Sequence, residues 1–262
     1  MERIEVGGLG IAFERSGEGP TVLLLHGLLS DCRVWRPQLE DLSNDFTVVA
    51  WDAPGCGSSS DPPDAFRMPH YADTLAGFID ALGLGRPHVV GLSFGAVLAL
   101  ELYRRYPKLP ATSVLASAYA GWAGSLPAGV VDERLRGCLR EAELPPERFV
   151  PNWIPGLLTD QAPAEVIDDV VAIMSEFHPV GYRAMAHALA EADLRDVLPR
   201  IDIPTLLLYG EVDRRSPLGV ADDLHARIPG STLSVMPGVG HLSNVEAPDL
   251  FNQEVREFLR MK

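Results

Sequence analysis

Cysteines, basic residues and long apolar runs are all scarce in this chain of 262 residues. The three cysteines, Cys32, Cys56 and Cys138, are odd in number and far apart, which excludes a disulfide framework or a metal site built on paired cysteines. No apolar run approaches the length of a membrane span, and residues 1–5 lack the charged-then-apolar pattern of a signal segment. Together these absences predict a cytoplasmic protein in a reducing compartment.

Basic residues are outnumbered by acidic ones. Asp and Glu number 36, Lys and Arg number 22, and the formal net charge is −14. Such a charge excludes nucleic acid and an anionic membrane as the main partner, because their phosphate groups attract a basic surface. The apolar share of 47% and the charged share of 22% are ordinary for a globular protein. We therefore expect a small molecule as the partner.

Short apolar segments alternate with helical patterns at both ends of the chain. Strands are predicted at residues 3–6, 10–15, 21–26, 46–52, 88–90, 112–118, 205–210 and 232–236, and helices at 35–42, 69–83, 96–103 and 248–260. Alternation of this kind is typical of a mostly parallel sheet covered by helices on both faces. The predicted fold class is therefore α/β, with an eight-stranded sheet.

The middle of the chain interrupts this alternation. Residues 119–192 contain no predicted strand; helical patterns occur at 130–143, 163–177 and 180–191, separated by the prolines at 145–146 and 151–155. A helical insertion between two strands of an α/β sheet is most simply a lid. We therefore expect a catalytic core made of residues 1–118 and 193–262 and a helical cap made of residues 119–192.

The most specific motif lies between the fifth strand and the helix that follows it. Gly91-Leu92-Ser93-Phe94-Gly95 fits G-x-S-x-G and joins a buried strand to a helix. A serine on such a tight turn has its hydroxyl exposed above the sheet, and the two glycines let the strand and helix backbones come close. Ser93 is the predicted nucleophile, and the N–H groups at the start of the helix point at any anion formed there.

A serine hydroxyl needs a base, and the base needs an acid that holds its tautomer. Asp213 follows the strand at 205–210 and is the predicted acid; Glu211 is the weaker choice for that role. His241 follows two glycines in the loop after the last strand and is the predicted base. The chain order serine, aspartate, histidine is the one expected for this architecture.

Two backbone N–H groups are predicted to hold the oxyanion. One belongs to Phe94, directly after the nucleophile, and the other to Leu28, in the loop after the strand that ends at His26. The side chains of both residues are expected to face the pocket, and Trp122, Leu126 and Trp153 of the insertion are candidate pocket walls. No paired-ligand spacing supports a metal site at His26 and Asp52, so His26 is expected to brace loops.

These residues resemble the α/β-hydrolase superfamily, in its branch of esterases, lactonases and carbon–carbon-bond hydrolases. The resemblance covers nearly the whole chain. It rests on His26-Gly27, on the segment 52–58, on the motif around Ser93, on Asp213 and on Gly240-His241. The tail at 241–248 is similar to that of enol-lactonases such as 3-oxoadipate enol-lactonase. Dehalogenases and epoxide hydrolases of that superfamily use an aspartate nucleophile, so Ser93 excludes both.

We therefore expect a serine hydrolase that cleaves a small carboxylic ester or lactone, with no metal and no organic cofactor. Three alternatives stay open at this point. The same triad is compatible with hydrolysis of a carbon–carbon bond in a vinylogous diketone, and with cofactor-free haloperoxidase or perhydrolase activity. An alternative of another class is a signalling receptor, because some members of this fold resemble sensors of a small ligand.

Overall fold

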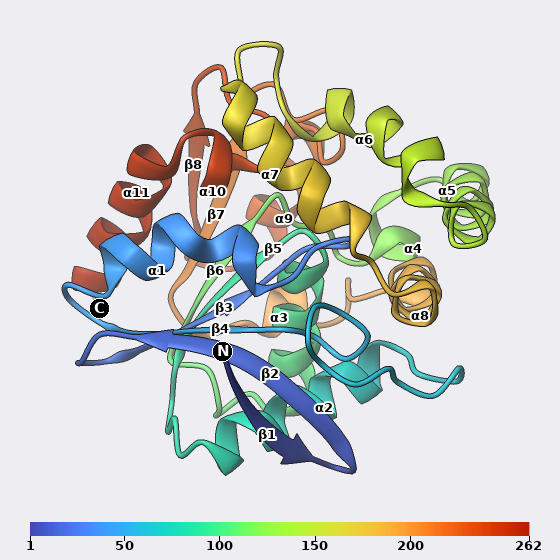
Figure 1. The fold of residues 1–262 in the computed structure, drawn as a ribbon. Coiled ribbons are helices and arrows are strands. Elements are labelled where there is room, and N and C mark those ends of the chain that lie inside the picture. Colours follow the sequence, from blue (N-terminus) through green and yellow to red (C-terminus); the bar gives the residue numbers. More distant parts are fainter. Residues whose placement is uncertain (262) are drawn as a thin grey trace.

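The computed structural model describes residues 1–261, so residue 262 of the expected catalytic core lies outside the described residues. The described chain forms one eight-stranded sheet (Figure 1). Its strands are β1 (Glu2–Val6), β2 (Leu9–Ser16), β3 (Thr21–Leu25), β4 (Thr47–Trp51), β5 (His88–Leu92), β6 (Thr112–Ala116), β7 (Thr205–Gly210) and β8 (Thr232–Met236). The strand order is β1-β2-β4-β3-β5-β6-β7-β8, and the pairs β1–β2 and β2–β4 are antiparallel. The other pairs are parallel, which confirms the predicted mostly parallel sheet.

Helices cover both faces of this sheet. The 3-10 helix η1 (Cys32–Trp35) leads into α1 (Arg36–Leu42), which packs with α11 (Pro248–Arg260) on one face, and α2 (Met68–Ala81) packs with α3 (Phe94–Arg105) on the other (Figure 1). Helix α9 (Leu218–Arg227) lies against β7 and β8, and the short α10 (Ser243–Glu246) precedes α11. Because both faces are covered, the central strands are continuously apolar; the residues of β7, for example, are all buried.

The chain between β6 and β7 is helical. It holds α4 (Trp122–Ser125), α5 (Ala128–Glu141), η2 (Pro146–Arg148), α6 (Val150–Leu157), α7 (Ala164–Ser175), α8 (Pro179–Glu191) and η3 (Leu198–Arg200). The sequence predicts α5, α7 and α8 but not α4 or α6. The prolines at 151 and 155 were expected to separate helices, and the structure corrects this. Pro151 lies in the first turn of α6, where no N–H is needed, and Pro155 lies two residues before its end.

Two further observations concern the whole chain. The three cysteines are buried thiols, and none of them is in a disulfide. Among residues 1–261, no helix combines the length and the apolar character that crossing a lipid bilayer requires.

Backbone segments approach one another closely at the turn from β5 into α3. A side chain at Gly91 of β5 would overlap the carbonyl of Gly95 in the first turn of α3, and one at Gly95 would overlap the carbonyl of Leu25 at the end of β3. Because those neighbours are backbone atoms, they cannot move aside without shifting the sheet. Glycine at both positions therefore fixes how closely α3 approaches β5 and β3.

This packing makes opposite predictions for two glycine substitutions. We expect Gly91→Ala to lower the free energy of unfolding by about 1–3 kcal/mol, because its methyl group meets backbone. Gly137→Ala in α5 is the control, because a methyl group there meets open space; we expect it to raise stability by up to about 1 kcal/mol. Urea unfolding at equilibrium measures both, and a Gly91→Ala variant as stable as the wild type would contradict the close approach.

Candidate active site

Ser93 sits on the turn between β5 and α3 in a strained conformation. Its φ is 53° and its ψ is −108°, outside the regions that a residue with a Cβ prefers, and such strain costs about 1–3 kcal/mol. Its N–H donates to the carbonyl of Ala116 at 2.9 Å, which ties the turn to β6. The backbone N–H of Phe94 begins α3, so it has no partner within the helix. The turn therefore carries the hydroxyl of Ser93 and, on the next residue, the backbone N–H of Phe94, which has no partner within the helix.

His241 and Asp213 form a buried pair in the loops that follow β8 and β7. Nδ1 of His241 lies 2.8 Å from Oδ2 and 3.0 Å from Oδ1 of Asp213, and the side chains are 5% and 0% exposed. Asp213 comes from the loop after β7 and His241 from the loop after β8. With Nδ1 committed to the carboxylate, Nε2 is the ring nitrogen that remains to accept a proton.

Backbone donors hold the Asp213 carboxylate in place. Oδ1 accepts hydrogen bonds from the N–H groups of Arg215 and Ser216, both at 2.8 Å. Burial acts to raise the pKa of Asp213, but the charge of His241 and the hydrogen bonds from His241 and Ser216 outweigh it. They hold the pKa of that carboxyl below its ordinary value. Asp213 is therefore a charged, oriented partner for the imidazole.

The loop that carries His241 is fixed from several sides. The hydroxyl of Ser117 donates to the carbonyl of His241 at 3.1 Å, and the N–H of Gly240 donates to Glu246 at 2.8 Å. Glu211, the weaker choice for the acid, accepts a hydrogen bond from the N–H of Gly238 at 2.8 Å and is exposed. It therefore braces the same loop, and the described structure shows no contact between its carboxylate and the imidazole.

The loop after β3 lies against the serine. A Cβ placed at Gly27 would lie 3.7 Å from Cβ of Ser93, and the next residue, Leu28, lines the same pocket as Ser93. Leu29 has a φ of 56°, so this loop also contains a strained turn. His26 braces it: Nδ1 donates to the carbonyl of Gly27 at 2.8 Å and Nε2 accepts from the N–H of Ala53 at 3.0 Å.

Burial lowers the pKa of His26, so its imidazole is neutral and suited to accept one hydrogen bond while it donates the other. The predicted bracing role therefore matches the hydrogen bonds of the structure. The imidazole has both ring nitrogens occupied and offers neither one to a metal ion.

Ser93 and His241 line the same pocket, whose empty space of about 660 Å³ includes its opening to solvent. Trp122 and Trp153 from the insertion line this pocket. Leu126 does not, because it caps the end of α4 and packs against the core. The side chain of Phe94 does not face the pocket either, because its ring is buried 5.2 Å from that of Tyr71; its N–H is unaffected by this.

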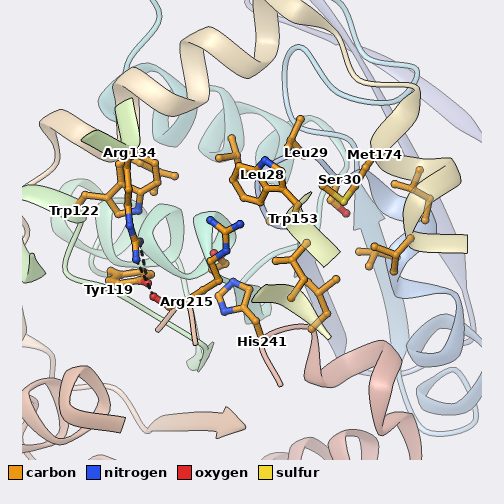
Figure 2. Close-up of a pocket in the computed structure, with 18 residues that line it drawn as sticks. Leu28, Leu29, Ser30, Tyr119, Trp122, Arg134, Trp153, Met174, Arg215 and His241 are labelled. Atoms are coloured by element: carbon orange, nitrogen blue, oxygen red, sulfur yellow. Dashed lines mark hydrogen bonds between the residues drawn. The ribbon is translucent and has the colours of Figure 1, made fainter. Parts of the chain in front are cut away.

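Two arginines that the sequence analysis did not single out line this pocket. In Figure 2, Arg134 lines one end of it beside Trp122 and Tyr119, Ser30 and Met174 lie toward the other end, and His241 lies between. Arg134 comes from α5 and Arg215 from the loop after β7, two residues beyond Asp213. The position of Arg215 beside the predicted acid was the one available signal. Arg134 had none, because its helix pattern resembles that of any charged surface helix.

One buried cluster of potential metal ligands already has hydrogen-bond and ion-pair partners within the described residues. The ligand atoms of Asp31, Cys32 and Asp52 lie within 4.8 Å of one another and are buried. Asp31 already holds Arg33 with both oxygens, and Asp52 accepts the N–H groups of Cys32 and Ser58, each at 2.8 Å. Burial and the nearby carboxylates raise the pKa of the Cys32 thiol far above its ordinary value, so it is not a thiolate ligand.

The chain is similar to known proteins along nearly its whole length. Residues 22–254 match the model of a family described as "Alpha/beta hydrolase family". The chain is 27% identical to 3-oxoadipate enol-lactonase 2 of Acinetobacter baylyi, over 92% of this chain and 89% of that protein. It is 28% identical to the human serine hydrolase BPHL, over 98% of this chain and 86% of that protein. Among solved structures, the malate-bound thermophilic esterase of Thermogutta terrifontis has a TM-score of 0.93 and 32% identity, over 100% of this chain and 99% of that one.

The lowered pKa of Asp213 makes a prediction about stability and pH. The unfolded carboxyl titrates at the ordinary pKa of an aspartate, about 4, and the folded one titrates below it. Asp213 therefore contributes stability that is present above about pH 4 and is lost as the pH falls through the folded value. We expect Asp213→Asn to remove this contribution, so its free energy of unfolding falls less steeply than that of the wild type in this acid range.

Urea unfolding at a series of pH values between about 6 and 3 measures both slopes. Glu211→Gln is the matched control, because it removes an exposed carboxylate from the same loop. We expect it to keep the wild-type slope. Equal slopes for wild type and Asp213→Asn would contradict the environment described for this carboxylate.

Proposed function

The chain belongs to the alpha/beta hydrolase family, and on that premise we propose that it is a serine hydrolase that cleaves a small carboxylic ester or lactone. One observation supports this most directly. A serine held in a strained turn and a histidine paired with a buried aspartate line the same pocket. That set supplies a nucleophile, a base and the group that orients the base, which acyl transfer to water requires.

In the proposed first step, Ser93 Oγ attacks the carbonyl carbon while Nε2 of His241 accepts its proton. Asp213 stabilises the resulting imidazolium through the Nδ1 hydrogen bond of 2.8 Å. The oxyanion accepts hydrogen bonds from the backbone N–H groups of Phe94 and Leu28, which lie on the turns next to the serine. Because these donors are fixed by the fold, they need no rearrangement as the charge develops.

Collapse of the tetrahedral intermediate leaves an acyl group on Ser93. His241 gives its proton to the departing alkoxide, and the alcohol leaves. His241 then takes a proton from water, the water attacks the acyl carbon, and the acid is released as Ser93 regains its proton. Activity is expected to fall as the pH is lowered, because a protonated His241 cannot act as the base.

We also propose that residues 119–192 form a cap that selects the substrate. Helices α4, α5, α6, α7 and α8 all contribute residues to the pocket that contains Ser93 and His241. The cap is joined to the loop of the base, because Leu242 N–H donates to the carbonyl of Leu157 at 3.0 Å and Thr159 N–H donates to Glu246 at 2.9 Å. A substrate that fills the pocket beneath the cap therefore lies next to the imidazole of His241.

The nucleophile is tested by covalent labelling. We expect a serine-directed phosphonate to add one equivalent to Ser93, and Ser93→Ala to lower kcat on an activated ester about 10⁴-fold or more. Ser30→Ala is the matched control, because Ser30 is the other serine of the pocket; we expect it to be labelled at Ser93 like the wild type. Peptide mass spectrometry locates the adduct, and an adduct on any other residue would overturn the assignment.

The cap is tested by shortening its aromatic walls. We expect Trp122→Ala and Trp153→Ala to change the discrimination between acetyl and longer acyl esters by about 1–3 kcal/mol in kcat/KM, as for other pocket contacts. Leu126→Ala is the control, because Leu126 lies in the same segment but outside the pocket. Labelling by a small phosphonate should change much less. If chain-length preference is untouched while labelling slows as much as ester hydrolysis, the helices are structural and do not select substrate.

A further inference from the structure

The pocket of Ser93 contains two half-buried arginines that form no ion pair within the described residues. Ten arginines form ion pairs with carboxylates; they are Arg15, Arg33, Arg67, Arg104, Arg105, Arg195, Arg200, Arg227, Arg256 and Arg260. Within residues 1–261, neither Arg134 nor Arg215 has a carboxylate within ion-pair distance, although the net charge of the protein is −14. Both are half-buried in the pocket wall.

The guanidinium of Arg215 stacks on an aromatic ring, and its N–H groups have no hydrogen-bond acceptor within the described residues. Its guanidinium carbon lies 3.8 Å from the ring centroid of Trp153, so the aromatic ring covers one face of the cation. The N–H groups of a guanidinium lie in its plane, and no hydrogen bond from this group is formed within the described part of the chain. Stacking therefore fixes the orientation of Arg215 and leaves its donors for a ligand.

Arg134 supports the same region of the pocket. Its Nη1 donates to the hydroxyl of Tyr119 and its Nη2 donates to the carbonyl of Arg215, both at 3.2 Å. Its guanidinium carbon lies 5.7 Å from the ring centroids of Tyr119 and Trp122. These bonds reach only neutral acceptors, so two positive charges lie close together and neither is compensated by an ion pair.

The groups around the two arginines do not supply the missing negative charge. Burial lowers the pKa of Arg215, and the positive charge of Arg134 lowers it further. Burial also raises the pKa of Tyr119 and Tyr182 above the ordinary value and that of Cys138 to about 11, so all three are neutral.

Two carboxylates lie nearby, but within the described residues neither is at ion-pair distance from Arg134 or Arg215, and each accepts hydrogen bonds from other groups. Asp213 is paired with His241. Glu141 accepts hydrogen bonds from Nε1 of Trp153 at 3.0 Å and from the hydroxyl of Tyr182 at 2.7 Å. A half-buried guanidinium with unused donors is costly unless an anion reaches it.

We propose that Arg215, with Arg134 behind it, binds a free carboxylate of the substrate, so that the preferred substrate is an anionic half-ester or a lactone that carries a second acid group. This rests on the proposed ester or lactone hydrolysis and specifies its substrate class. A carboxylate matches the planar fork of a guanidinium and accepts two parallel hydrogen bonds from it. Hydrolysis of a half-ester with one water then releases an alcohol and a dicarboxylate.

Matched neutral and anionic esters test the proposal. We expect the monomethyl esters of succinate, glutarate or adipate to be hydrolysed with a higher kcat/KM than the corresponding dimethyl esters. In Arg215→Gln the ratio of the two kcat/KM values should fall roughly 10- to 100-fold, the effect of losing a hydrogen bond to a charged group. Arg134→Gln should lower the same ratio, and Arg215→Lys should restore part of it.

Neighbouring arginines provide the controls. Arg214 and Arg136 are exposed, each close in sequence to one of the two pocket arginines, and their glutamine variants should keep the wild-type ratio. If the ratio is near one in the wild type, or is the same in Arg215→Gln and Arg214→Gln, the carboxylate subsite is overturned while ester hydrolysis stands.

Binding without turnover separates this proposal from the proposed hydrolysis. We expect calorimetry to detect glutarate binding to Ser93→Ala, and to show it weakened roughly 10- to 100-fold in Ser93→Ala/Arg215→Gln. If no ester is hydrolysed but this difference is found, the anion site stands and the proposed reaction fails. If inorganic phosphate binds Ser93→Ala more tightly than glutarate does, the carboxylate class is wrong.

Discussion

A sheet of parallel strands gathers the carboxyl ends of its strands along one edge, and this constraint determines where Ser93, Asp213, His241 and the loop of Leu28 lie. β3 ends at the loop of Leu28, β5 at Ser93, β7 at the loop of Asp213 and β8 at the loop of His241. Leu28 and His241, which are more than two hundred positions apart in the chain, thereby line the same pocket. The close packing of α3 on β5, which only glycine permits, then turns the serine toward the pocket.

The candidate site contains backbone conformations and buried polar groups that are unfavourable locally and that the rest of the fold stabilises. Ser93 and Leu29 hold positive φ angles, Asp213 and His241 are buried as a polar pair, and Arg215 is half-buried without an ion pair. Each of these is unfavourable in isolation. They persist because the surrounding hydrogen bonds and the large apolar core leave these residues little freedom. Strain and unpaired charge concentrated around one pocket are typical of a site that binds or transforms a ligand.

The helices between β6 and β7 form much of the wall of that pocket. The sheet loops carry Ser93, His241 and Arg215, whereas the helices provide the aromatic walls and Arg134. Contacts from Leu157 and Thr159 to the segment at 242–246 connect the two parts. In the proposed mechanism, the chemistry is therefore a property of the sheet edge, and the choice of substrate is a property of the helices.

The sequence by itself determined the eight strands and their mostly parallel arrangement, because continuous apolar runs between helices have few other ways to be buried. It also singled out Ser93, Asp213 and His241, whose order follows from their places after successive strands; their catalytic roles stay predictions. Only the tertiary structure decided that Phe94 points into the core, that Leu126 lies away from the pocket, and that Arg134 meets Arg215. These depend on how helices without a repeating pattern pack against the sheet, and no local spacing records that packing.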